Sequence, residues 1–257
     1  MRILFIRHGD PDYEHDTLTE KGHREAALLA ERIEQWNVGD CFVSPLGRAQ
    51  ATASYSLQKL GITAQTMDWL REFPAQLDIN LSAQLQDAYP DTFREGGRYG
   101  KRIVWDMLPS YMTAHPEYSD RNAWRNSEVT RCSDMNQVYD YVTSQFDRLL
   151  AGYGYVREGS LYRVTRENTA TVTFFCHFGI TAVLLSHLWS LSPFTMLHDL
   201  VLAPTSVTEV VTEERQQGIA SFRGTKLGDV THLTIAGEEP SFSARYCEVY
   251  SNMEQRH

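Results

Sequence analysis

The stretch ILFIRHG, residues 3–9, lies near the start of the sequence, and in it four apolar residues are followed directly by an arginine, a histidine and a glycine. A short, unbroken apolar run is typical of a strand that is buried on both faces of a sheet. Two cationic side chains at the end of such a strand are costly to bury unless they meet an anion. We therefore expect Arg7 and His8 to lie on the floor of an anion pocket.

Strands and helices alternate along most of the remaining chain. Apolar residues at helical spacing predict helices over about 20–37, 47–60, 135–150 and 180–191. Short β-branched, apolar or alternating runs predict strands over 40–44, 63–70, 169–177, 206–214 and 218–225. This order predicts an α/β fold, namely a three-layer α/β/α sandwich around a mostly parallel, mixed central sheet.

The pattern loosens over residues 73–133, where prolines, a glycine pair and many aromatic residues interrupt it. We interpret residues 1–257 as one domain with a cap insertion at about 73–133. Arg98 and Arg102 lie within this stretch among aromatic residues and are candidates for binding the non-reacting end of a substrate. The alternative is a lid that packs its own aromatic side chains and exposes a solvated charged face.

Composition limits the partners that we expect. A net charge of -9 argues against nucleic acid or an anionic membrane as the main partner, because either requires a broad positive face. The longest apolar stretch, residues 180–191, is too short to span a bilayer. The four cysteines lie far apart and the histidines show no metal-binding spacing, so we expect no metal and no cofactor. A reducing cytoplasm is the expected location, and a homodimer stays open.

Charged side chains follow the predicted strands at their carboxyl ends, which is where ligands bind in sheets of this kind. The residues at these ends, in chain order, are Arg7 with His8, Arg48 on the opening turn of a helix, Glu72, and His177. Two guanidinium groups and two imidazoles match the oxygens of a phosphoryl group in transfer better than they match a carboxylate, which needs fewer donors. The sequence therefore predicts a small phosphorylated substrate.

Six short motifs carry a resemblance to a known family. They are FIRHG (5–9), LTEKG (18–22), SPLGRAQATA (44–53), LRE (70–72), CHFG (176–179) and TSVTEVV (205–211). Through them the chain resembles the histidine phosphatase superfamily, branch 1, also called phosphoglycerate mutase-like. The resemblance implies a phosphatase in which His8 is the nucleophile, in which Arg7, Arg48 and His177 bind the phosphate, and in which Glu72 is the general acid and base.

Departures from the family pattern narrow the expected activity. No Asp follows the second histidine as in the acid phosphatases and phytases, so the acid role falls to Glu72. Asp10 is a weaker candidate for that role and a candidate substrate-binding residue. The residues with which mutases grip their substrate after RHG are replaced by GDPDYEHD, which favours hydrolysis. Phosphoglycerate mutase-type transfer, a phosphoprotein phosphatase with the insertion as docking surface, and a non-catalytic phosphate-binding protein stay open as alternatives.

Overall fold

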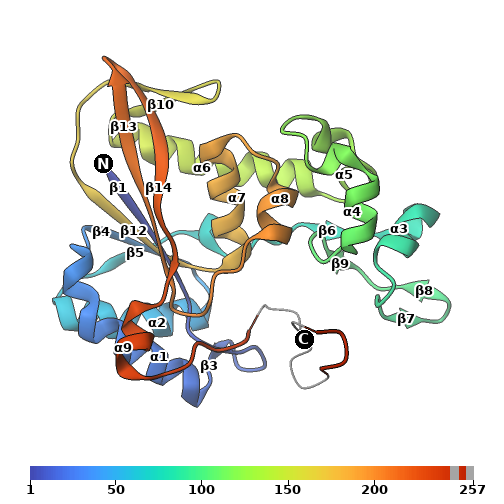
Figure 1. Cartoon of the computed structure of the whole chain (residues 1–257), viewed down its shortest axis with the longest axis horizontal. Helices are drawn as coiled ribbons and strands as arrows, with labels where there is room; N and C mark the ends of the chain where they lie inside the picture. Colours follow the sequence, from blue (N-terminus) through green and yellow to red (C-terminus); the bar gives the residue numbers. More distant parts are fainter. Residues whose placement is uncertain (244–248, 253–257) are drawn as a thin grey trace.

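The computed structural model describes residues 1–243 and 249–252, and its centre is a mixed sheet of eight strands (Figure 1). In spatial order the strands are β10 (Tyr155–Glu158), β11 (Leu161–Val164), β14 (Ile219–Asp229), β13 (Val207–Gln216), β1 (Arg2–Arg7), β12 (Thr171–Cys176), β4 (Asp40–Val43) and β5 (Ala64–Thr66). Strands β1, β12, β4 and β5 run parallel, whereas β13, β14, β11 and β10 pair antiparallel. The predicted α/β fold class is confirmed.

Helices cover both faces of the sheet. One layer holds α1 (Glu20–Arg32) and α2 (Gly47–Leu60), and the other holds α6 (Met135–Gly152) and α7 (Phe178–Trp189) (Figure 1). The shorter helices α8 (Pro193–Asp199) and α9 (Thr231–Ala236) follow later in the chain. Because successive side chains of a strand point to opposite faces, Ile3 and Phe5 pack in one core while Leu4 and Ile6 pack in the other. This is why the first strand has no polar face.

The edges of the sheet differ from the sequence prediction. Strand β5 ends at Thr66 rather than near residue 70, because the chain turns into a 3-10 helix, η2 (Asp68–Leu70), that buries Trp69 and Leu70. Residues 155–164, for which the sequence pattern predicted no strand, form the β10–β11 hairpin, in which Tyr155 and Tyr162 are buried. A hairpin at the edge of a sheet needs only one apolar face. Here two tyrosines among charged residues form that face, and this pattern is too weak to predict strands from the sequence.

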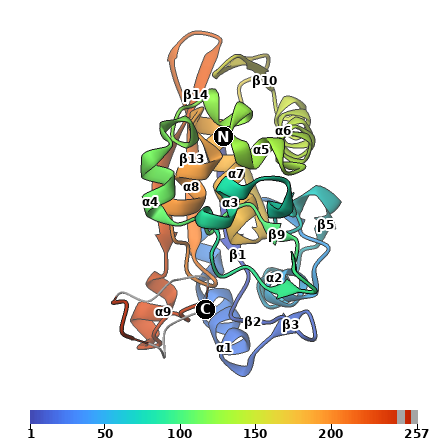
Figure 2. The same ribbon diagram turned by 90° about the vertical axis from the view of Figure 1, so that its right-hand side faces the viewer.

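Residues 73–133 contain only short elements. These are β6 (Gln76–Leu77), η3 (Ile79–Leu81), α3 (Ala83–Ala88), β7 (Arg94–Glu95), β8 (Arg98–Tyr99), β9 (Arg102–Ile103), α4 (Pro109–Ala114), η4 (Pro116–Tyr118), η5 (Ala123–Asn126) and α5 (Glu128–Arg131). They lie beyond α7 and α8, away from α1 and α2 (Figures 1 and 2). Tyr89, Tyr118 and Trp124 are fully buried here and belong to the same core as α7. That residues 73–133 function as a cap stays a prediction.

Candidate functional site

The two predicted site histidines follow neighbouring parallel strands. Strands β1 and β12 pair in register up to Arg7 and Cys176, and the His8 amide donates to the Cys176 carbonyl at 3.0 Å. This register brings the rings of His8 and His177 together, with centroids 5.0 Å apart. Both side chains are almost wholly buried, at 2% and 0% exposed. Two residues 169 positions apart in the chain thus meet at one strand end.

The His8 ring is held in one tautomer. Its Nδ1 donates to the carbonyl of Gly9 at 2.7 Å, since a carbonyl can only accept, and this leaves Nε2 as the atom with a lone pair. Burial lowers the pKa of His8 well below its ordinary value, and the charges of Arg7 and Arg48 lower it further. The ring is therefore neutral at pH 7, as a nucleophile must be.

His177 caps the start of α7 and bonds to the loop after β4. Its Nε2 lies 2.7 Å from Ser44 Oγ, whereas its Nδ1 is buried and has no hydrogen-bond partner among the described residues. Burial is the main cause that lowers the pKa of His177, followed by the charges of His8, Arg48 and Arg7. His177 is thus in ring contact with His8 and close enough to the two arginines to be affected by their charges.

Arg7 is buried and held by two distant segments. Its Nη1 donates to the carbonyl of Leu202 at 2.6 Å and to that of Ser243 at 3.1 Å, and its Nη2 donates to Ser243 Oγ at 3.4 Å. Its Nε is buried without a partner in the described part of the chain. The segment around Ser243 gave no signal in the sequence, because it follows the last regular element.

Arg48 is oriented by an aspartate that the sequence analysis missed. Its Nη1 donates to Asp16 Oδ1 at 2.6 Å, and the Gly47 amide donates to Asp16 Oδ2 at 2.7 Å. A side chain at Gly47 would be blocked, because its Cβ would lie 2.0 Å from the Asp16 carbonyl oxygen. The guanidinium also lies 5.3 Å from the ring centre of Tyr13. Tyr13 and Asp16 both belong to the acidic stretch that follows RHG, and this stretch is the feature of the sequence that could have indicated partners for an arginine.

Glu72 does not end a strand, so that part of the prediction is wrong. It follows η2, because the chain has already left the sheet after β5. Its Oε1 accepts from the amides of Phe73 at 2.9 Å and Ile180 at 3.1 Å. Burial raises the pKa of Glu72, and the Phe73 amide and the charge of Arg7 partly oppose this rise. A carboxyl group with a raised pKa is suited to hold a proton for transfer.

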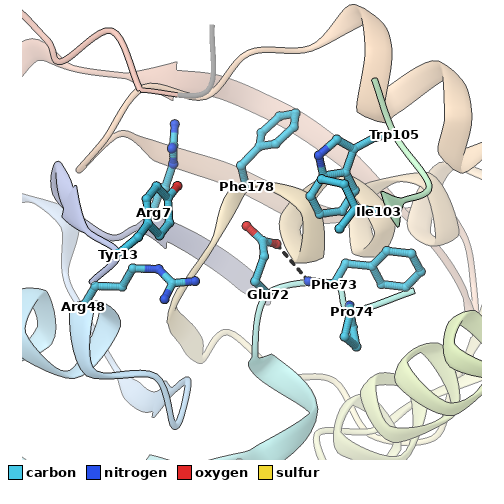
Figure 3. A pocket seen from close by; sticks show the side chains of 9 residues that line it. All are labelled: Arg7, Tyr13, Arg48, Glu72, Phe73, Pro74, Ile103, Trp105 and Phe178. Atoms are coloured by element: carbon cyan, nitrogen blue, oxygen red, sulfur yellow. Dashed lines mark hydrogen bonds between the residues drawn. The ribbon is translucent and has the colours of Figure 1, made fainter. Parts of the chain in front are cut away.

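A cavity of about 370 Å³ opens beside these groups. It is lined by Arg7, Tyr13, Arg48, Glu72, Phe73, Pro74, Ile103, Trp105 and Phe178 (Figure 3). Figure 3 shows the two arginines on one side, the aromatic side chains of the insertion and of α7 on the other, and Glu72 between them. The volume is near the lower end of the range for small-molecule sites, which is about 300 to 1,000 Å³.

The structure does not bring the three candidate substrate residues into this cavity. Asp10 accepts from Thr19 Oγ1 at 2.7 Å and from Ser241 Oγ. Arg98 is exposed in the β7–β8 hairpin, and Arg102 pairs with Asp106 at 3.3 Å within the insertion. None of the three lines the cavity. Their substrate role stays a prediction without geometric support.

No group of three or more His, Cys, Asp or Glu side chains among residues 1–243 and 249–252 is arranged to hold a metal ion. In the same residues, no helix combines the length and the apolarity needed to cross a membrane.

The chain is similar to known proteins both in sequence and in fold. Residues 3–103 match the family model described as the histidine phosphatase superfamily, branch 1. A curated leucine–tRNA ligase from Brucella anthropi is 27% identical over 104 residues, which are 40% of this chain but only 11% of the ligase. The chain therefore spans a small part of the curated relatives that it matches.

Two solved structures share the fold. A phosphoserine phosphatase variant from Entamoeba histolytica, solved in complex with phosphoserine, superposes with a TM-score of 0.55 at 16% identity, covering 90% of this chain and 98% of that one. A mycobacterial glucosyl-3-phosphoglycerate phosphatase with inorganic phosphate gives 0.54 at 18% identity, covering 90% and 98%. The chain is thus similar to branch 1 of the histidine phosphatase superfamily over residues 3–103, and it shares its fold with these solved phosphatases.

Proposed function

We propose that this protein hydrolyses a small phosphate monoester through a phosphohistidine at His8. The observation that carries the proposal is the contact of His8 with His177 next to a cavity that Arg7, Arg48 and Glu72 line, so that four separate parts of the chain contribute to one site. The solved phosphatases of the same fold act on phosphorylated metabolites by their names, which supports a substrate of this class.

In the first step, the lone pair on His8 Nε2 attacks phosphorus, and the bond from phosphorus to the alcohol oxygen breaks. Glu72, protonated, gives its proton to that oxygen, and the alcohol leaves. Glu72 Oε1 already accepts two amide hydrogen bonds, so the proton resides on Oε2. This assignment fits the raised pKa of Glu72 and the neutral state of His8.

In the second step, the Glu72 carboxylate takes a proton from water. The water oxygen attacks phosphorus, the bond from phosphorus to Nε2 breaks, and its electron pair returns to His8. Inorganic phosphate leaves, and both residues regain their starting states.

The remaining residues of this site stabilise the charge on the transferred group. Arg7 Nε, Arg48 Nε and His177 Nδ1 are buried polar atoms without a partner among the described residues. Buried polar groups usually have partners, and each exception calls for an explanation. An anion bound in this site supplies acceptors for such donors, and its charge is balanced by the two guanidiniums.

The first test measures the release of inorganic phosphate from p-nitrophenyl phosphate and from a panel of metabolite monoesters. The second test quenches the reaction rapidly and maps acid-stable and base-stable phosphorylation on the protein. We expect turnover and a base-stable phosphorylated His8. His8→Ala should lower kcat by about 10⁴-fold or more, because removing a nucleophile stops the covalent step. His115→Ala is the matched control, since that histidine bonds to the Tyr111 carbonyl within the insertion.

Each alternative has a distinct outcome in this test. Full activity of His8→Ala would remove the proposed nucleophile. Transfer of phosphate between metabolites without release of inorganic phosphate would favour a mutase. Hydrolysis confined to phosphopeptides would favour a phosphoprotein phosphatase, and phosphate binding without turnover of any substrate would favour a non-catalytic protein.

A further inference from the structure

We infer that the alcohol part of the substrate is a compact, uncharged, apolar group that carries a ring, and not a glycerate, an amino acid or another charged residue. This inference rests on the proposed function and names its substrate class. It is drawn from the wall of the cavity opposite the two arginines.

This wall, formed by Phe73, Ile103, Trp105 and Phe178, is apolar and largely aromatic (Figure 3). Phe73 and Trp105 stack with ring centroids 6.4 Å apart and an interplanar angle of 28°. Phe73 is only 1% exposed and Phe178 only 8% exposed, so their positions are fixed by packing. Rigid aromatic surfaces of this kind favour the burial of an apolar ring.

The wall lies where the leaving alcohol must emerge. Gly179, in the first turn of α7, shows how close the groups are. A Cβ on this glycine would lie 2.6 Å from the Trp105 ring and 2.8 Å from Glu72 Oε1. Trp105 and the Glu72 carboxyl therefore pack against the same backbone position. An alcohol oxygen that takes its proton from Glu72 has its carbon skeleton beside Trp105 and Phe73.

The charges of the described residues that line the cavity disfavour a second anion on the substrate. Among the described residues that line it, the cations are Arg7 and Arg48, both assigned to the phosphate. A carboxylate on the alcohol part would face the apolar wall and Glu72, and burying a charge without a partner is costly. Arg102, the nearest arginine in sequence to Ile103 and Trp105, is already paired with Asp106 and bonded to Thr92.

The test compares benzyl phosphate with 3-phosphoglycerate and O-phosphoserine. All three leave from ordinary alkyl alcohols, so differences report on binding of the carbon skeleton rather than on leaving-group acidity. We expect kcat/KM for benzyl phosphate to exceed that for either charged ester by about tenfold or more, in line with the discrimination of an apolar pocket. Benzylphosphonate, which cannot be hydrolysed, should inhibit more strongly than 3-phosphonopropionate.

Variants locate the preference in the wall. Trp105→Ala should lower the ratio of kcat/KM between benzyl phosphate and O-phosphoserine by about tenfold, mainly through KM, and Trp105→Phe should keep most of it. Phe93→Ala is the matched control, because Phe93 is an aromatic residue of the same insertion that is 71% exposed and does not line the cavity. Circular dichroism checks that each variant is folded.

The outcomes separate the two claims. If the wild type prefers the charged esters, or if Trp105→Ala leaves the ratio unchanged while folded, the substrate class is wrong although the phosphatase stands. If the wild type hydrolyses none of the three esters and p-nitrophenyl phosphate is also untouched, the proposed function itself fails.

Discussion

His8 and His177 face each other across two parallel strands, with their ring centroids 5.0 Å apart and the amide of His8 bonded to the carbonyl just before His177. The charge that one ring would carry lowers the pKa of the other, in addition to the effect of burial. Both rings are therefore neutral near pH 7, and the charges of the nearby arginines contribute to this.

The pH dependence of activity should depend on Glu72 at high pH and on His8 at low pH. The pKa of Glu72 is raised, so the acid form persists above the ordinary range of a carboxyl, and kcat/KM should fall as pH rises through that pKa. The pKa of His8 is lowered, so protonation removes the nucleophile only well below pH 6.5. We expect an acidic to neutral optimum in a pH–rate profile.

Glu72→Gln should abolish the high-pH limb and lower kcat by about 10² to 10⁴-fold on alkyl phosphates. The loss in kcat/KM, which reports the first step, should be much smaller on p-nitrophenyl phosphate, because p-nitrophenolate leaves without a proton. The second step, in which Glu72 takes a proton from water, slows equally for both esters. Steady-state kinetics on both esters check this, and equal losses in kcat/KM would contradict the role of Glu72 as proton donor.

Asp16→Asn should weaken catalysis through Arg48. The substitution removes the carboxylate that binds Arg48 Nη1 and the Gly47 amide, so the guanidinium loses its fixed orientation. We expect kcat/KM to fall by about 10-fold to 100-fold, less than for Arg48→Ala, which deletes the donor itself. Asp12→Asn is the control, since Asp12 pairs with His15 instead. Wild-type activity in Asp16→Asn would show that Arg48 needs no such support.

Gly179→Ala should impair activity while leaving the fold intact. The added Cβ would overlap Trp105 and Glu72 Oε1, so both must shift, and a displacement of about 1 Å at a proton donor can cost 100-fold in rate. Gly152→Ala in α6 is the control, because nothing lies within 4 Å of its Cβ position. Activity assays beside thermal denaturation distinguish a local effect from unfolding. Unchanged kinetics in Gly179→Ala would contradict the tight packing at this position.

Acid should destabilise the protein through His232. This buried ring bonds to Thr205 Oγ1 at 2.9 Å, and burial lowers its pKa to about 4. The pKa of this histidine is about 6.5 in the unfolded chain and about 4 in the folded protein, so between these pH values the unfolded chain binds more protons. The contribution of His232 to stability is therefore complete above pH 6.5 and is lost as the pH falls toward 4. The contribution lost is about 3 kcal/mol, at about 1.4 kcal/mol for each pKa unit.

Urea unfolding at pH 7 and pH 4.5 measures this loss. His232→Gln should reduce the difference between the two pH values, whereas His15→Gln, at a site exposed to solvent, should not. An unchanged pH difference in His232→Gln would assign the acid sensitivity to the other buried histidines. The Thr205 amide also donates a hydrogen bond to the His8 carbonyl, and Thr205 is the partner of His232. His232→Gln should therefore also cause a small loss of activity.

The sequence by itself determined the parts of this protein that depend on local pattern. Apolar runs and helical spacing are properties of neighbouring residues, and they predicted the order of the central strands and helices. Because carboxyl ends of parallel strands meet at one edge, the same pattern predicted that Arg7, His8 and His177 would come together. Glu72 was found by its motif, although the chain reaches it through a 3-10 helix and not a strand.

Only the tertiary structure decided which distant side chains touch these residues. Asp16 on Arg48, Ser243 on Arg7 and Trp105 against Gly179 depend on the paths of loops with no periodic pattern. Such contacts join residues that are far apart in the chain or lie in irregular segments. Their formation depends on packing and on backbone approach rather than on local propensity, and so the apolar character of the cavity wall was not readable from the sequence.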